Sequence, residues 1–326
     1  METPPPQLGG YRFRAATPED LPALAAFLTQ AHPDSPTDLG TLERNDSFRR
    51  PGEPFQRTLA ERGGMLVGMG ETGVPRSHSY PGWLALGVDV LPGEQGGPLP
   101  AALLAHAEAF ALAHGATTLL STVKESWPEK ALLEATGYVE HDRMWNSVLD
   151  LRTLEFTRFA AQEAKAAASG VQIRTLAQEG GLGTEAQQRR LYALFHALLS
   201  DVPSAAPISV WPFEVWQERY VPHLKHPEGV VLAVAPNGEW VGLTELHTPR
   251  SAHPQMLQNG LTGVRREWRG HGLGLALKLA AARAALQRGF THARTNNHSR
   301  NRPMLGINEA LGFVREEASV TLRKDV

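Results

Sequence analysis

The stretch that decides the fold is LTGVRREWRGHGLG, residues 261–274 of a chain of 326 residues. Its first four residues are apolar or small and are typical of the end of a β-strand. Immediately after it, Leu275, Leu279 and Leu286 recur at the spacing of one helix face. The sequence therefore predicts a strand, a glycine-rich loop and a helix in direct succession.

The loop itself holds Gly270, Gly272 and Gly274 together with three arginines. A glycine-rich turn that enters a helix N-terminus gathers backbone N–H groups that have no acceptor, and such groups bind phosphate. Arginine side chains add charge-assisted hydrogen bonds to the same oxygens. The loop is thus a candidate phosphate site, although a plain strand-to-helix turn would have the same outline.

Two common phosphate motifs do not fit this loop. A dinucleotide fingerprint would need glycine where Leu275 stands, and a P-loop would need Gly-Lys followed by serine or threonine. What remains is R-x-x-G-x-G, formed by Arg269, Gly272 and Gly274. This pattern resembles the pyrophosphate loop of the GNAT superfamily, the acyl-CoA-dependent N-acyltransferases.

A second stretch, residues 301–313, reads NRPMLGINEALGF and adds to the resemblance. Asn301 can cap a helix, Pro303 suits its first turn, and Gly312 can end it. The segment is similar to the part of GNAT proteins in which an asparagine after a strand leads into a helix that ends in Leu-Gly-Phe.

The composition limits the other classes of protein. The chain is 42% hydrophobic and 20% charged, which is ordinary for a globular protein, and its length suits two domains. It has no cysteine, which excludes disulfides and thiolate metal sites, and its histidines show no metal-ligand spacing, so no metal is expected. Because no signal peptide or membrane-length apolar run is visible, we expect a cytoplasmic protein without a membrane partner. The net charge of −2 argues against nucleic acid.

The two halves of the chain repeat the same landmarks. Gln95 precedes Gly115 by the same twenty residues that separate Arg269 from Gly289. We interpret this as a domain duplication: an α+β chain of two tandem GNAT-like domains, residues 1–150 and 171–326, joined by a helical linker at residues 151–170. The layout is similar to that of mycothiol synthase. The resemblance implies, for each domain, a mostly antiparallel twisted sheet flanked by helices, with its fourth and fifth strands splayed apart.

Only the second copy is suited to a polyanion. Pro98 and Pro100 stand where the second copy has Gly272 and Gly274, and proline has no N–H to offer a phosphate. Residues 264–302 hold eight arginines and one lysine against one acid, whereas the matching part of the first half is acidic. We therefore expect the C-terminal domain to bind acetyl-CoA and the N-terminal domain to be degenerate.

The resemblance also implies the contacts to acetyl-CoA, the expected co-substrate. The residues that match the family's binding segments are Val264, Arg265, Arg266, Arg269, Gly270, His271, Gly272, Leu273, Gly274, Leu275, Asn301, Pro303 and Asn308. In this family the amine attacks the thioester directly, so no acyl-enzyme is expected.

The amine must lose a proton before it can attack. Deprotonating a lysine-like ammonium at pH 7 costs roughly 4–5 kcal/mol, so a base or a water chain to one is expected. Glu245 and His247 alternate onto one face of a predicted strand at residues 240–247 and are the candidates. Asn308 stands where many family members have a tyrosine acid; it can bind the sulfur but cannot release a proton.

The acceptor is expected to be a small-molecule amine or a peptide amine. Asp201, Trp211, Phe213 and Trp216 follow the first strand of the second domain and are candidate contacts, although tryptophan there packs as often as it binds. A non-catalytic acyl-CoA-binding regulator remains the alternative, with a nucleic-acid-associated acetyltransferase as a weaker one. Either a monomer or a homodimer is compatible with the sequence.

Overall fold

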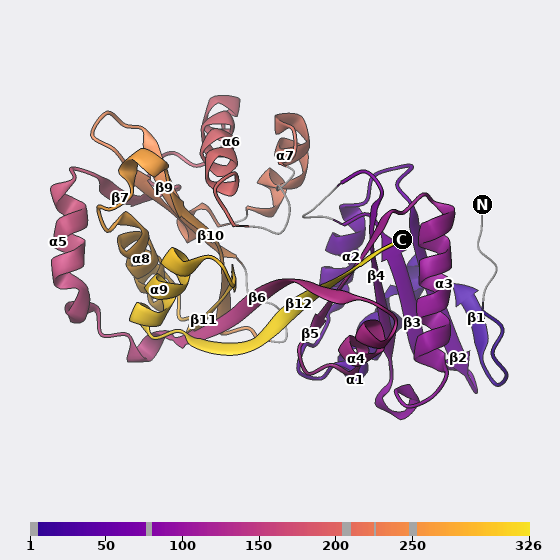
Figure 1. Cartoon of the computed structure of the whole chain (residues 1–326). Coiled ribbons are helices and arrows are strands. Elements are labelled where there is room, and N and C mark those ends of the chain that lie inside the picture. The colour runs from indigo at the N-terminus through magenta and orange to yellow at the C-terminus, as the bar shows by residue number, and fades with distance from the viewer. Residues whose placement is uncertain (1–5, 76–79, 204–209, 225, 248–252) are drawn as a thin grey trace. The chain divides into compact units, whose positions relative to one another are not determined.

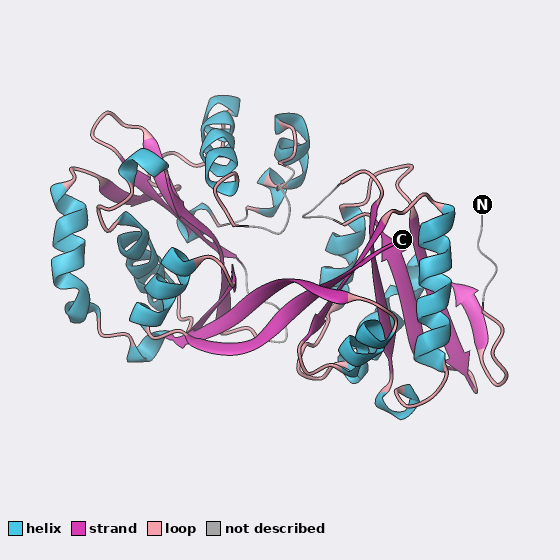
Figure 2. Ribbon diagram, viewed as in Figure 1, coloured by secondary structure: helices cyan, strands magenta, loops and turns pink. Residues whose placement is uncertain are grey.

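The computed structural model describes residues 6–75, 80–203, 210–224, 226–247 and 253–326. It mixes helices and strands, as predicted (Figure 2). The chain divides into two compact units. Unit 1 is Met1–Arg143 with Glu317–Val326, and unit 2 is Met144–Glu316.

Unit 1 is built on one twisted sheet, in which the described strands pair antiparallel except for β4 and β5, which run parallel. Its strands, in spatial order, are β1 (Arg12–Ala15), β2 (Phe55–Arg62), β3 (Met65–Gly73), β4 (Trp83–Val90), β5 (Thr118–Lys124) and β12 (Val314–Asp325). Its helices are α1 (Leu21–Ala31), α2 (Leu39–Ser47), α3 (Leu99–Ala113) and α4 (Pro128–Ala135), with 3₁₀ turns η1 (Pro18–Asp20) and η2 (Pro92–Glu94) (Figure 1).

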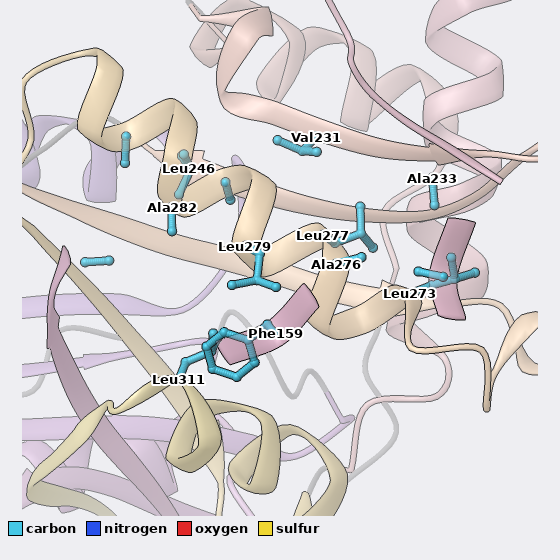
Figure 3. Close-up of a cluster of buried hydrophobic side chains, with 14 of the residues drawn as sticks. Phe159, Val231, Ala233, Leu246, Leu273, Ala276, Leu277, Leu279, Ala282 and Leu311 are labelled. Carbon is cyan, nitrogen blue, oxygen red and sulfur yellow. The ribbon is translucent and has the colours of Figure 1, made fainter. Parts of the chain in front are cut away.

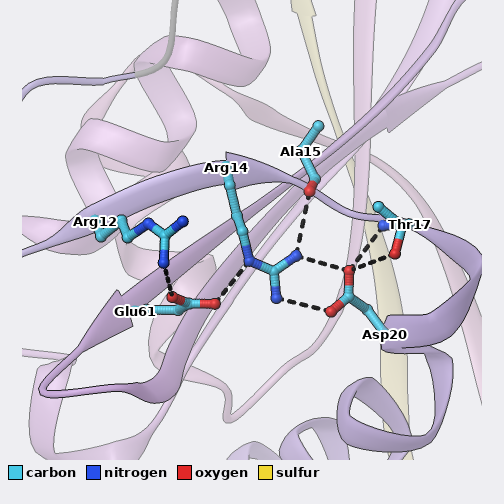
Figure 4. A network of polar contacts seen from close by, with 6 residues as sticks. All are labelled: Arg12, Arg14, Ala15, Thr17, Asp20 and Glu61. Carbon is cyan, nitrogen blue, oxygen red and sulfur yellow. Dashed lines mark hydrogen bonds and ion pairs between the residues drawn. The ribbon is translucent and has the colours of Figure 1, made fainter.

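An arginine network fixes the start of unit 1 (Figure 4). Arg14 on β1 donates from Nε to Glu61 on β2 at 2.7 Å and from both terminal nitrogens to Asp20 at 2.7 Å. The Asp20 carboxylate also accepts the Thr17 N–H at 2.8 Å and so closes a capping box at the turn before α1.

Unit 2 repeats the plan. Its strands, in spatial order, are β6 (Val139–Asp150), β11 (His292–His298), β10 (Met256–Val264), β9 (Trp240–His247), β8 (Val230–Val234) and β7 (Gln172–Thr175). Its helices are α5 (Ala160–Ala168), α6 (Glu185–Leu199), α7 (Phe213–Arg219), α8 (Leu273–Gln287) and α9 (Arg302–Leu311). Short 3₁₀ turns lie at η3 (Leu151–Thr153), η4 (Phe156–Phe159), η5 (Val221–His223), η6 (Pro227–Gly229) and η7 (Arg266–Trp268).

Two apolar layers cover the two faces of the unit 2 sheet. On one face Leu277 and Leu279 of α8 pack with Val231 and Leu246 of the strands, which confirms the helix predicted from its periodicity (Figure 3). On the other face Leu243 packs with side chains of α6 and α7. Leu243 and Leu246 of β9 lie three residues apart and serve opposite layers, as the alternation of side chains along a strand requires.

The last strand of the N-terminal repeat, β6, lies in the sheet of unit 2. The last strand of the C-terminal repeat, β12, lies in the sheet of unit 1. Residues Met144–Asp150 of β6 pair with β11, and Ser319–Asp325 of β12 pair with β5. The unit boundaries consequently differ from the predicted division at residue 150. The predicted linker also belongs to unit 2, because α5 buries Ala166 in the same core as α8.

Among the described residues, no helix combines the length and the apolar character that a membrane crossing requires.

Candidate active site

The site begins where two parallel strands of unit 2 part. β10 and β11 pair at Met256, Leu257 and Gln258, and within the described residues their pairing ends there, although β10 continues to Val264. On its other side β10 stays paired with β9 as far as Val264. The two strands thus open toward their carboxyl ends, as the resemblance implied.

The glycine-rich loop follows β10. Gly270 and Gly272 have φ values of 84° and 78°, in the left-handed region that favours glycine. Gly272 is the N-cap of α8, and no side chain caps the helix. Ala276 is the residue whose amide donates to the Gly272 carbonyl, at 3.1 Å. The amides before it, from Leu273 to Leu275, are those that a helix leaves without an internal acceptor, which is the arrangement that binds anions.

Two arginines of this loop already converge on one carboxylate. Arg266 and Arg269 donate to the two oxygens of Asp201, at 2.6 and 2.5 Å, and these bonds hold the pKa of Asp201 below its usual value. Arg269 also donates from Nε to the Val264 carbonyl at 2.9 Å. Asp201, which the sequence placed among the acceptor contacts, therefore lies at the candidate phosphate loop. A third arginine, Arg265, pairs with Glu239 instead.

The corresponding loop of unit 1 has two prolines and a neighbouring buried acid in place of these features. Pro98 is the N-cap of α3, and Pro100 lies in its first turn. Glu94, next to the loop, is 3% exposed; it accepts the Tyr11 hydroxyl at 2.5 Å and pairs with Arg62. A buried carboxylate and missing amides both disfavour a diphosphate there.

Glu245 on β9 is the most perturbed acid near the parted strands. It is 2% exposed, and burial raises its pKa to about 8. The Tyr220 hydroxyl donates to Oε1, and the Leu261 N–H donates to Oε2 at 3.1 Å. His247 Nε2 lies 3.8 Å from Oε2, and this imidazole is half exposed. The two predicted candidates are therefore brought together, one inside the protein and one at its surface.

A bulge in β10 supplies the Leu261 amide. The pairing with β9 shifts between Asn259 and Thr262, so Gly260 and Leu261 both lie opposite Glu245. A Cβ at Gly260 would come within 2.2 Å of His247 Nε2, which explains the glycine.

Tyr220 was not predicted. It stacks on Trp216 with ring centroids 4.9 Å apart, and the link to Glu245 spans 25 residues with no local motif.

Asn308 on α9 is buried beside β11. Its Nδ2 donates to Asn297 at 2.6 Å, while its Oδ1 is buried and, among the described residues, has no hydrogen-bond partner. An acceptor of this kind fits an amide N–H such as those of a pantetheine arm. Asn301 caps α9 by accepting the Met304 N–H at 3.3 Å, and Pro303 lies in the first turn, as the sequence predicted.

The aromatic acceptor candidates are mainly structural. Phe213 and Trp216 are 6% and 3% exposed and belong to the core between α6, α7 and the sheet. The Trp211 carbonyl accepts the Tyr192 hydroxyl at 2.7 Å. Trp216 Nε1 is buried without a partner among the described residues. The structure gives these three residues packing roles and leaves their contact with an acceptor a prediction.

The described residues contain no group of three or more acidic, histidine or cysteine side chains that could hold a metal ion.

Comparison with known proteins agrees with this geometry. Residues 191–313 match the model of the Acetyltransferase (GNAT) family. A curated mycothiol acetyltransferase from Arthrobacter sp. (strain FB24) is 32% identical over 96 residues, which are 29% of this chain and 30% of that protein. The match thus spans under a third of that relative.

Two solved structures resemble the whole chain. A GCN5-related N-acetyltransferase from Sphaerobacter thermophilus has a TM-score of 0.72 at 21% identity, covering 98% of this chain and 96% of that one. A tandem GNAT protein from the clavulanic acid biosynthesis pathway, described without AcCoA, has a TM-score of 0.72 at 21% identity, covering 97% and 98%. The chain therefore has the fold of this tandem GNAT protein, and its residues 191–313 match the GNAT acetyltransferase family model.

Proposed function

We propose that this protein is an N-acetyltransferase that transfers the acetyl group of acetyl-CoA to a primary amine of a small molecule or peptide, with the site in unit 2. The proposal rests on one observation: two features lie next to β10, the strand that separates from β11. One is the uncapped N-terminus of α8, and the other is the buried carboxyl of Glu245 on the neighbouring strand.

The loop supports binding of the diphosphate. Amides from Leu273 to Leu275 offer donors, and Arg269 and Arg266 add two positive charges, of which Asp201 offsets one. Asn308 Oδ1 offers a buried acceptor to the pantetheine arm. Unit 1 has Pro98 and Pro100, which offer no N–H, and carries the buried Glu94 beside them, so we assign one acetyl-CoA to each chain.

Glu245 supports the proton transfer. The neutral amine attacks the acetyl carbonyl carbon, the C–S bond breaks, and the thiolate leaves with the bonding electrons. The proton from the amine nitrogen passes to Glu245, directly or through His247 or water. A base whose pKa is near the working pH suits this step, because it is partly ionised and still accepts a proton readily. Asn308 has no proton to give, so the thiolate leaves unprotonated.

The test is a screen of amine acceptors with acetyl-CoA, read as thiol release, on the full chain. We expect release that depends on the amine and on Glu245. A second function, acyl-CoA binding without transfer, is favoured by Asn308 in place of a tyrosine. It predicts binding of acetyl-CoA in calorimetry with no thiol release for any amine, and that outcome would remove the enzymatic proposal.

Asp201→Asn is expected to strengthen acetyl-CoA binding. The carboxylate competes with the diphosphate for the arginine pair, and removing its charge frees both guanidinium groups. Exposed ion pairs contribute about 0–1 kcal/mol, so we expect the dissociation constant to fall by about two- to fivefold in calorimetry. Glu185→Gln, which removes a surface pair with Arg189 on α6, is the matched control and should change nothing. Weaker binding by Asp201→Asn would show that the carboxylate organises the arginines instead.

A further inference from the structure

A buried polar chain connects α8 to the bulge in β10. Lys278 on α8 is 4% exposed, and its Nζ donates to Asn259 Oδ1 at 2.7 Å. The Asn259 amide group in turn donates to Thr244 Oγ1 at 2.9 Å and to the Glu245 carbonyl at 2.8 Å. Both donors of that amide are therefore used, and its acceptor is held by the lysine.

These hydrogen-bonded side chains lie on the face of the sheet opposite the Glu245 carboxyl and do not contact it. Thr244 and Glu245 are successive residues of β9, so their side chains point to opposite faces of the sheet. Thr244 also bonds Thr262 at 2.7 Å, on the far side of the bulge. Hydrogen bonds of Asn259 and Thr262 thus flank the two bulge residues, Gly260 and Leu261. Of these two, Leu261 has the backbone N–H that donates to Glu245.

A bulge leaves residues without ladder partners, so its shape needs other contacts. Burying a lysine is costly unless it forms a bond that the fold requires. Burial lowers the pKa of Lys278 to about 7, and the Phe313 ring lies 5.0 Å from its Nζ. An amine keeps N–H donors whether charged or neutral, so the bond to Asn259 persists in both states.

We propose that Lys278 and Asn259 form a positioning pair that fixes the bulge, so that the Leu261 N–H meets the Glu245 carboxylate. The pair touches neither substrate and acts through Leu261. This inference rests on the proposed function of Glu245 as the proton acceptor. It also makes α8, the helix that begins at the phosphate loop, the element that supports the base.

The test compares Lys278→Met with the wild-type protein in the full chain. Methionine fills the buried space without a donor and removes a buried amine, so the fold is expected to persist. Losing the Leu261 bond removes an interaction that favours the ionised Glu245, so the acidic limb of kcat/KM should move to higher pH by about one unit. At pH 7 kcat/KM should fall about tenfold, while the KM for acetyl-CoA stays within about twofold. The titratable side chains facing Glu245, Tyr220 and His247, are unchanged in this variant.

Asn259 provides the second variant. Asn259→Leu adds no charge and removes the acceptor for Lys278 together with both donors to β9, so it should shift the acidic limb of kcat/KM as Lys278→Met does. Because the two residues act as one unit, Lys278→Met with Asn259→Leu should shift the limb no further than either change alone.

Hydrogen exchange at the Leu261 amide gives a readout without catalysis. We expect about tenfold faster exchange in Lys278→Met, with rates in β7 unchanged. An unaltered Leu261 rate and an unaltered pH profile would overturn the positioning role and leave a packing role only. If the wild-type protein transfers no acetyl group, the proposed function fails by itself, and the exchange rates still decide whether the pair holds the bulge.

Discussion

Replacing Glu245 with glutamine is expected to lower kcat for acetyl transfer by about 10²–10⁴-fold, the usual contribution of a general base. Glutamine keeps the size of the side chain and an oxygen for the Leu261 N–H, but it cannot take up the proton. In the wild-type protein kcat/KM should rise with pH through about 8, where the buried carboxyl ionises. Steady-state kinetics between pH 6 and about pH 10 measure both effects.

Two controls separate chemistry from misfolding. An acceptor whose amine is already neutral at pH 7, such as an alkoxyamine, should lose less rate in Glu245→Gln, because less deprotonation is required. The second control is the folding stability, which changes with pH in the opposite direction to kcat/KM. In the folded protein the pKa of Glu245 is about 8, above the ordinary value that it has in the unfolded chain. The contribution of this group to the free energy of unfolding therefore falls as the pH rises between the two pKa values. The glutamine variant should therefore gain in Tm relative to the wild type at pH 9. A full rate for Glu245→Gln with a basic amine would assign the base elsewhere.

Replacing Gly274 with proline is expected to raise the dissociation constant of acetyl-CoA by about ten- to a hundredfold. The change deletes one amide of the α8 N-terminus, and a hydrogen bond to a charged group contributes about 1.5–3 kcal/mol. Proline is compatible with this position, because Pro100 follows Leu99 at the start of α3 just as Gly274 follows Leu273 at the start of α8. The measurement is calorimetric titration with acetyl-CoA.

Gly274→Ala is the matched control, since it adds a Cβ and keeps the amide. That Cβ would lie 3.2 Å from Ile307 Cδ1, the tip of a flexible side chain that can move aside. The alanine variant should bind within about threefold of the wild type. Equal losses in the proline and alanine variants would trace the effect to crowding and not to the amide.

The local features of unit 2 could be predicted from sequence because short-range rules govern them. The periodicity after Leu275 became α8, Asn301 became the cap of α9, and Gly312 ends that helix in the left-handed conformation with φ of 90°. The alternation of Glu245 and His247 likewise placed both on one face of β9.

The long-range features could not be predicted in this way. Strands β6 and β12 have the alternation of ordinary last strands, and nothing in that pattern tells which sheet edge each one joins. Asp201 was assigned to the acceptor because aspartate suits an amine, yet it pairs with loop arginines that lie 65 and 68 residues away. Tyr220 reaches Glu245 only through the packing of α7 on the sheet.

Calorimetric titration of the full chain with acetyl-CoA, compared at low and moderate salt, tests the central claim most directly. The account predicts one acetyl-CoA per chain, with affinity that falls as salt rises because the loop arginines meet a polyanion. It also predicts that Gly274→Pro weakens this single event, whereas Glu94→Gln in unit 1 creates no second one. Two equivalent sites, or binding that Gly274→Pro leaves untouched, would contradict the assignment of acetyl-CoA to the N-terminus of α8.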